Sequence, residues 1–196
     1  MPILLPTVFL IWKNIVRKCF VMSIKIQTPI TREKAKSLKA GDRVLVSGTI
    51  YTARDAAHKR MLEDLNNGQS LPVDIKDITI YYAGPAPAKP GQVIGSCGPT
   101  TSGRMDAYAP TLISLGQTAM IGKGERSVDV IDAMIKHGAV YFGAIGGAGA
   151  LIAKSVKSAE VVSYDDLGTE AIRKLIVEDF PLIVVIDSEG NNLYNR

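Results

Sequence analysis

Apolar and polar residues in the first third of the chain alternate with a period of two. Residues 43–47 and 49–52 show this alternation around a central glycine, as in the strands of a half-exposed sheet. Residues 24–26 predict a further short strand, and residues 31–39 predict a basic, exposed helix that ends at Gly41. The first third is therefore predicted to be a small β layer.

A helical period follows. Residues 54–65 predict a helix because four apolar residues fall on one stripe and an Asn-Asn-Gly sequence ends it, with Thr52 as a candidate cap. A strand is predicted at residues 78–82. The proline-rich residues 84–91 are typical of an ordered surface crossing and not of a domain boundary.

The remainder of the chain alternates between strand and helix patterns. Strands are predicted at residues 93–96, 118–121, 140–145, 160–164 and 182–187, and helices at residues 105–115, 127–137, 146–156 and 169–178. Ser127 is a candidate cap and Gly138 a candidate stop for one of these helices. This alternation predicts an α/β fold, in which a β-rich N-terminal third packs on a sheet covered by helices.

Length and charge limit the function classes. The 196 residues are 46% apolar, enough for a substantial core, and residues 23–196 are predicted to form a single domain. The formal charge is +4, but three of the 23 basic residues lie in residues 1–22, which contain no acid. The remainder, with 20 basic and 19 acidic residues, is nearly neutral, so a nucleic-acid groove is not indicated.

Residues 1–22 differ from the rest of the chain. An apolar run at residues 2–12 precedes the positive charges, the reverse of a secretory signal, and it is too short to span a bilayer. The segment is interpreted either as an extension that docks on this protein or a partner, or as a leader translated upstream of a true start at Met22. The second interpretation is favoured because a regular pattern begins at Ser23; a membrane tether at residues 2–12 is a weaker alternative.

Two cysteines, Cys19 and Cys97, cannot build a disulfide framework or a cysteine-only metal site. This usage fits a reducing cytoplasm. The two histidines, His58 and His137, lack the spacing of metal ligands.

The densest chemistry lies in residues 95–106, which read GSCGPTTSGRMD. Glycines let a backbone approach a ligand, hydroxyls can donate or accept a proton, and arginine can bind a carboxylate through two N–H groups. Thr100, Thr101 and Ser102 lie between a predicted strand and a predicted helix, where free N–H groups favour an anion, and Arg104 follows in the first turn. The alternative is a capped turn without ligand.

Two further cations are candidates on similar grounds. Arg54 begins a predicted helix beside Asp55, and on local pattern alone a solvent-exposed arginine–aspartate pair is the favoured interpretation. Lys123 lies between two glycines directly after a strand, where α/β sheets bind ligands, with a flexible turn as the alternative. Residues 143–149, GAIGGAG, fit neither a dinucleotide fingerprint nor a P-loop and are assigned to close packing.

Several sequence motifs together resemble one family. GPTTSGRMD, with TARDAAHKR before it and IGKGER, AVYFGAIGGAGAL and VEDFPLIVVIDSEGN after it, is similar to the β subunit, or C-terminal domain, of class I iron-sulfur fumarate hydratases and L(+)-tartrate dehydratases. The resemblance runs from residue 23 to the C-terminus. It implies a swivelling β/β/α domain and a hydro-lyase that uses a [4Fe-4S] cluster to interconvert malate and fumarate, a reaction of the tricarboxylic acid cycle.

The resemblance also implies residue roles. Thr100 matches the threonine to which the family assigns the catalytic base, with the adjacent Thr101 as the second candidate. Arg54, Arg104 and Lys123 match substrate-binding cations. A threonine hydroxyl is a poor base at neutral pH, so it would need nearby cations and backbone donors.

The cluster is expected to lie on a partner. The family's cluster uses three cysteines, whereas residues 23–196 contain only Cys97, which is expected to pack near the loop. An α subunit is therefore expected to carry the cluster and the acid, in a hetero-oligomer, with no cofactor or metal bound by this chain alone. There are two alternatives: the β subunit of an L-tartrate dehydratase, or a non-catalytic module that binds a dicarboxylate. The isolated chain could also form a homodimer.

Overall fold

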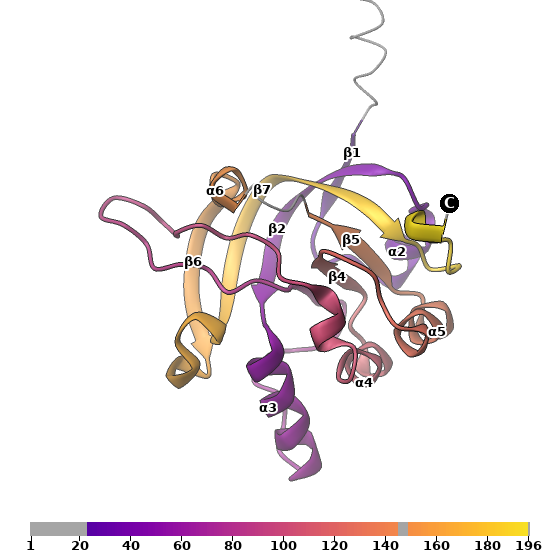
Figure 1. Ribbon diagram of the computed structural model, residues 1–196, viewed down its shortest axis with the longest axis horizontal. Helices are drawn as coiled ribbons and strands as arrows, with labels where there is room; N and C mark the ends of the chain where they lie inside the picture. The colour runs from indigo at the N-terminus through magenta and orange to yellow at the C-terminus, as the bar shows by residue number, and fades with distance from the viewer. Residues whose placement is uncertain (1–22, 145–148, 196) are drawn as a thin grey trace, which may run out of the picture.

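The computed structural model describes residues 23–144 and 149–195, which form a seven-stranded mixed sheet (Figure 1). The strands are β1 (Ile24–Gln27), β2 (Arg43–Thr52), β3 (Thr79–Tyr81), β4 (Ala119–Gly122), β5 (Val140–Gly143), β6 (Val156–Ser163) and β7 (Ile172–Ile186). Their order is β1-β2-β3-β4-β5-β7-β6, and β2 also pairs with β7. This extra pairing joins β2, β3, β4, β5 and β7 into a ring, so the sheet is partly closed like a barrel.

Strand direction places the loops. β2, β3, β4 and β5 pair in parallel, whereas β7 runs antiparallel to β2, β5 and β6. The carboxyl ends of β2, β3 and β4 therefore meet at one edge, from which the connections to the following helices leave.

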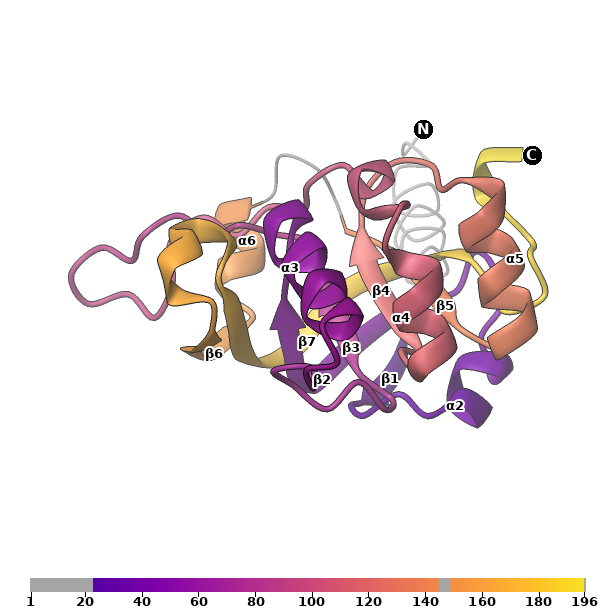
Figure 2. The same ribbon diagram turned by 90° about the horizontal axis from the view of Figure 1, so that it is seen from below.

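Helices pack around the ring. They are α2 (Arg32–Ser37), α3 (Asp55–Asn66), α4 (Ala109–Leu115), α5 (Val128–His137) and α6 (Gly149–Ala153), with 3-10 turns η1 (Ser102–Met105), η2 (Asp165–Glu170) and η3 (Leu193–Asn195). In Figure 2, α3, α4 and α5 lie in a row along one face of the sheet. The mixed α/β class predicted from the sequence is confirmed. The β-rich N-terminal third is not a separate layer packed on the sheet, however, because β1 and β2 belong to the same sheet as the other strands.

Two cores result from the alternation of side chains along the strands. Tyr81 and Phe142 face the interior of the ring, with α2 and α6 closing its ends, whereas Ile80, Met120 and Tyr141 face α3, α4 and α5. Neighbouring strand residues thus point to opposite cores, as the period of two requires.

The prediction of a helix at residues 169–178 is wrong. Residues 172–186 form the long strand β7, and residues 165–170 form η2. Ile172 and Leu175 are buried three residues apart, which imitates a helical stripe. The backbone of β7 instead pairs with β2 on one side and β6 on the other, and this tertiary pairing overrides the local pattern.

Other differences are local. Residues 43–52 form one strand with a bulge, where Gly48 has φ +109° and a Cβ would lie 2.3 Å from Thr28 Oγ1. Thr52 does not cap α3; its hydroxyl accepts a hydrogen bond from the Arg173 N–H at 3.3 Å. Residues 93–96 form a loop, and the helix predicted from residue 105 begins at Ala109 because η1 precedes it.

Some predictions cannot be compared directly. Those for residues 1–22, and the first part of the helix predicted at residues 146–156, lie outside the described residues; the described part of that helix is α6. Within residues 23–144 and 149–195, no helix is long and apolar enough to cross a membrane.

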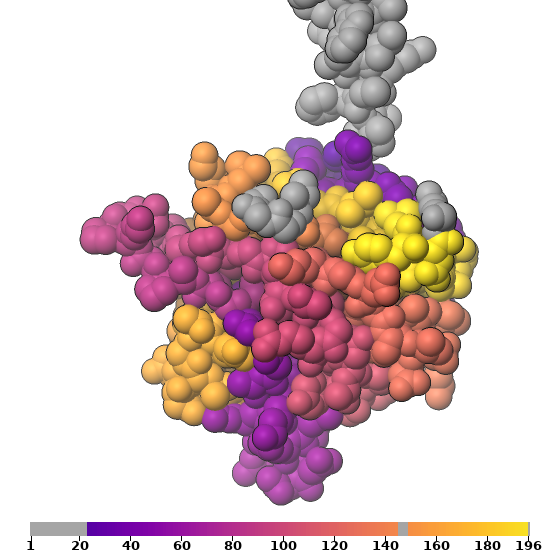
Figure 3. Space-filling model, viewed as in Figure 1, coloured from indigo at the N-terminus to yellow at the C-terminus, as the bar shows by residue number. Residues whose placement is uncertain are grey.

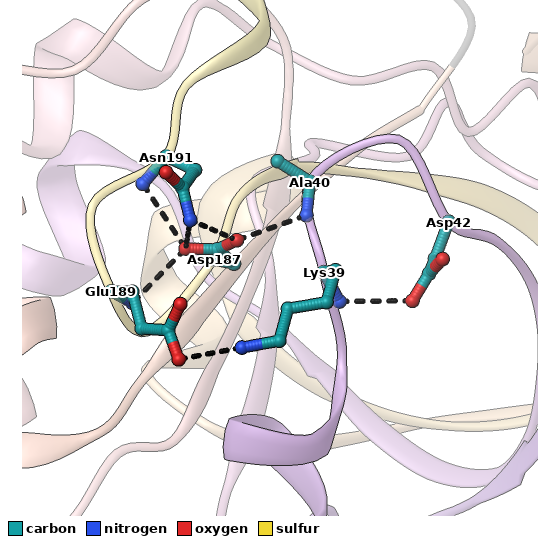
Figure 4. Close-up of polar contacts among 6 residues, drawn as sticks. All are labelled: Lys39, Ala40, Asp42, Asp187, Glu189 and Asn191. Atoms are coloured by element: carbon teal, nitrogen blue, oxygen red, sulfur yellow. Dashed lines mark hydrogen bonds and ion pairs between the residues drawn. The ribbon is translucent and has the colours of Figure 1, made fainter.

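The C-terminal segment is tied to the start of β2 through Asp187 (Figure 4). Its carboxylate accepts hydrogen bonds from the N–H groups of Ala40, Glu189 and Asn191 and from the Asn191 amide. Burial opposes ionisation, but these donors outweigh it and lower the pKa of Asp187. Beside it, Lys39 Nζ lies 2.6 Å from Glu189 Oε1.

His58 is buried between α3 and the sheet. Its Nδ1 donates to the Arg54 carbonyl at 2.9 Å, and its ring meets the Tyr82 ring edge-on with centroids 5.3 Å apart. Among the described residues, Nε2 has no hydrogen-bond partner. Burial, with the charge of Arg126, lowers the pKa of His58 to about 4, so the imidazole is neutral near pH 7.

Replacing His58 by glutamine should make stability less sensitive to acid. The unfolded histidine binds a proton below about pH 6.5, whereas the folded one resists protonation down to about pH 4. Between about pH 7.5 and about pH 5, the free energy of unfolding of the wild type should therefore fall by about 2 kcal/mol more than that of His58→Gln. Urea unfolding at both pH values measures this difference, and equal losses in the two proteins would contradict it.

Candidate active site

The structure brings residues 98–106, called here the threonine loop, together with Lys123 at the carboxyl edge of the sheet. The Thr100 N–H donates to the carbonyl of Tyr82, directly after β3, at 2.7 Å. The Ser102 N–H donates to the carbonyl of Lys123, directly after β4, at 2.8 Å, and Thr101 pairs with Lys123 as a parallel bridge. The loop is thus attached to the ends of two adjacent strands.

These bonds correct one expectation. The N–H groups of Thr100 and Ser102 are not free to bind an anion, because both donate to strand ends. The loop also does not open directly into an α-helix, since α4 begins only at Ala109. Anion binding at this edge would therefore depend on the cationic side chains and not on these backbone N–H groups.

Hydrogen bonds and close packing fix Cys97 and Gly98, which precede the threonines. The Tyr81 hydroxyl donates to the Cys97 carbonyl at 2.6 Å, and the Cys97 N–H donates to the Gly149 carbonyl at 3.1 Å. A Cβ on Gly149 would lie 2.9 Å from the Gly98 nitrogen, so only glycine permits this approach. Burial raises the pKa of the Cys97 thiol to about 12, and the protonated thiol packs beneath the loop.

Arg54 and Arg104 converge on a shared acid. Nη2 of Arg54 lies 3.4 Å from Asp55 Oδ1 and 3.3 Å from Glu170 Oε1, and Nη2 of Arg104 lies 3.0 Å from Asp55 Oδ2. The arginine–aspartate pair expected as the alternative for Arg54 is therefore present, but it also connects α3 to the threonine loop. All five predicted site residues lie around this edge.

Glu170 is a residue that the sequence did not indicate, because the stretch around it was interpreted as a helix. Its carboxylate contacts Arg54 and accepts the Ala56 N–H at 3.0 Å, which caps the first turn of α3. In Figure 3 the start of α3, in purple, emerges between the pink threonine loop and the orange η2 segment. Arg54 also needs Gly84, where a Cβ would lie 3.0 Å from Arg54 Cδ.

The cations differ in accessibility. The Arg54 side chain is 20% exposed, that of Arg104 is 52% exposed, and Lys123 is exposed. Among the described residues no carboxylate lies within ion-pair distance of Lys123. Three cations and the carboxylates of Asp55 and Glu170 leave one net positive charge. Of the three cations, Arg104 and Lys123 are exposed enough to bind a small anion.

The donor set does not fit an iron-sulfur cluster. Such clusters require several thiolates, whereas Cys97 is buried and protonated. In the part of the chain that the structure describes, no group of three or more histidine, cysteine, aspartate or glutamate side chains is arranged to hold a metal ion.

Comparison with known proteins places the chain in a family. Residues 10–196 match the family model described as fumarase C-terminus. The chain is 42% identical to fumarate hydratase 2 of Leishmania major over 179 residues, 89% of this chain and 32% of the relative. It is 48% identical to the aerobic class I fumarate hydratase of Escherichia coli strain K12 over 156 residues, 79% of this chain and 28% of the relative.

A relative of similar length has a different name. The putative L(+)-tartrate dehydratase subunit beta of Methanocaldococcus jannaschii is 42% identical over 173 residues, which cover 85% of this chain and 89% of that protein. The chain thus spans about a third of the fumarate hydratases it matches but most of the subunit. As its motifs predict, this chain belongs to the fumarase C-terminus family.

Proposed function

We propose that this chain is the β-type half of a hydro-lyase that interconverts malate and fumarate, built on a swivelling β/β/α domain. One observation carries the proposal: Arg54, Arg104, Lys123 and the Thr100–Thr101 pair converge at one sheet edge. Membership of the fumarase C-terminus family supports it.

The reaction explains why this set of residues is suitable. Removal of water from a 2-hydroxy dicarboxylate needs anchors for two carboxylates, a base for the proton next to a carboxylate, and a Lewis acid for the departing hydroxide. Arginine binds a carboxylate with two parallel N–H groups, and lysine binds it as a point charge. Arg54, Arg104 and Lys123 supply the anchors, and Asp55 and Glu170 hold the arginines in place before substrate arrives.

Thr100 is proposed as the base. Its backbone is fixed to the end of β3, its side chain is half-buried, and it lies in the same loop as Arg104 and next to the residue bridged to Lys123. Nearby positive charge stabilises an alkoxide and so makes a hydroxyl a stronger proton acceptor. Thr101, which is more exposed, is the second candidate.

The Lewis acid is proposed to come from a partner. Because the described residues do not fit a cluster, a [4Fe-4S] cluster is assigned to an α-type polypeptide with three cysteines, where it would supply the acceptor for hydroxide. The name of the Methanocaldococcus relative, a subunit beta, supports such a hetero-oligomer. That relative also supports L-tartrate as the alternative substrate.

The activity is tested with the assembled enzyme. The chain, co-purified with its α-type partner without oxygen, should consume fumarate and form malate, and it should act more slowly on L-tartrate. Faster turnover of L-tartrate would transfer the assignment to tartrate dehydratase. No turnover of either compound, together with dicarboxylate binding by the isolated chain, would indicate a non-catalytic binding module.

Substitution of the threonines separates the two candidates for the base. In the assembled enzyme, Thr100→Ala should lower kcat by about a hundredfold to ten-thousandfold with little change in KM, because only proton transfer is lost. Thr101→Ala should lower kcat by less than about tenfold, and Thr111→Ala, at an exposed position on α4, should match the wild type. If the Thr101→Ala enzyme is inactive and the Thr100→Ala enzyme is active, Thr101 and not Thr100 is the base.

Replacing Arg54 by lysine should weaken substrate binding. Lysine keeps the charge but loses the paired N–H groups, so KM for fumarate should rise about tenfold with a smaller change in kcat. Arg43→Lys is the matched control, because Arg43 is exposed at the opposite end of β2. Steady-state kinetics measures both, and an unchanged KM in Arg54→Lys would remove this residue from the binding site.

A further inference from the structure

We propose that the Tyr141 hydroxyl, supported by Arg126, is a positioning group. It holds the threonine loop at a fixed separation from residues 122–126, called here the Lys123 loop. This inference rests on the proposed function for the roles of the two loops. The contacts themselves belong to the fold and can be tested separately.

Tyr141 connects the two loops through one oxygen atom. It lies on β5, and its hydroxyl donates to the Gly124 carbonyl at 2.9 Å. Since that proton is used, the Ser102 hydroxyl must donate to the Tyr141 oxygen, at 2.8 Å. Ser102 follows Thr101 and Gly124 follows Lys123, so the oxygen is hydrogen-bonded to the immediate neighbours of two of the proposed site residues.

The contact is buried and closely fitted. Ser102 and Tyr141 are both fully buried. A Cβ at Gly122, the last residue of β4, would lie 2.0 Å from Ser102 Oγ, so only glycine lets Ser102 reach the tyrosine. Burial raises the pKa of Tyr141, and the hydroxyl stays a donor throughout the neutral range.

Arg126 packs against the Tyr141 ring and holds it in place. Its guanidinium lies between two rings, with Cζ 5.1 Å from the Tyr141 centroid and 5.3 Å from the Tyr82 centroid. Its Nε donates to Asp106 Oδ1 at 2.7 Å, and Asp106 Oδ2 accepts the Ser127 N–H at 2.6 Å. Because Asp106 ends the threonine loop, Arg126 fixes the loop's far end as well as the Tyr141 ring.

The threonine loop is thereby held at three points along its length. Thr100 is held by the Tyr82 carbonyl, Ser102 by Tyr141, and Asp106 by Arg126. Proton transfer depends on the position of the base within a few tenths of an ångström, whereas binding of an anion by long side chains tolerates more movement. Loss of the Tyr141 oxygen should therefore affect turnover more than binding.

The test compares single-atom variants of the assembled enzyme. Tyr141→Phe and Ser102→Ala should each lower kcat about ten- to a hundredfold while KM changes less than about threefold. Since the two residues share one hydrogen bond, the double variant should be little worse than either single variant. Losses that multiply in the double variant, or kcat values within about twofold of wild type, would overturn the proposal.

A control distinguishes positioning from general destabilisation. Thr118→Val removes another buried hydrogen bond, from the Thr118 hydroxyl to the Ile30 carbonyl, just before β4 at the opposite edge of the sheet. It should lower Tm about as much as Tyr141→Phe but leave kcat unchanged. An equal loss of kcat at an equal loss of Tm would show that Tyr141 acts only through stability.

Hydrogen exchange tests the contacts without any turnover. In the isolated chain, Tyr141→Phe should speed amide exchange in both residues 98–106 and residues 122–126, whereas Thr118→Val should not. If the assembled wild type is inactive, the proposed function fails while this measurement still decides whether Tyr141 holds the two loops. Unchanged exchange in both segments would refute the positioning role.

Discussion

The antiparallel pairing of β7 with β2 is the constraint on which the rest of the structure depends. β7 pairs with β2, β5 and β6, and the first two of these pairings close the parallel strands into a ring. Closure gives the ring its own apolar interior and leaves the outer face for α3, α4 and α5. Within the ring, the parallel pairing of β2, β3 and β4 places their carboxyl ends at one edge, which is where the proposed site residues gather.

Local patterns predict the position of only some candidate residues. Lys123 directly follows the strand β4, and parallel strands bring such positions to one edge of a sheet. The threonine loop reaches the same edge through hydrogen bonds to Tyr82 and Lys123, because the strand predicted before it at residues 93–96 is a loop. The second part of β7 is predicted correctly, as a strand at residues 182–187, but its first part is predicted as a helix. The buried residues Ile172 and Leu175 imitate a helical spacing, and the partner strands lie far away in the chain. Glu170 is not indicated for the same reason, since the position of this acid depends on where β7 begins.

The supporting residues were not predictable for another reason. Arg126 and Tyr141 fall within recognisable motifs, but a buried arginine between two tyrosines has no local signature. Its place is set by tertiary packing, where a buried charge must find an acid and apolar rings within reach. Asp106 provides that acid at 2.7 Å. A residue's sequence neighbours do not reveal such a requirement.

The attachment of the threonine loop to the ends of β3 and β4 also affects how a partner can bind. The backbone N–H groups of Thr100 and Ser102 donate to the carbonyls of Tyr82 and Lys123, directly after β3 and β4, so the loop opens only when these hydrogen bonds break. A partner would then meet a surface that is already ordered, and it would lose little conformational entropy on association. If the proposed α-type partner binds at this edge, it would dock on this loop without folding it.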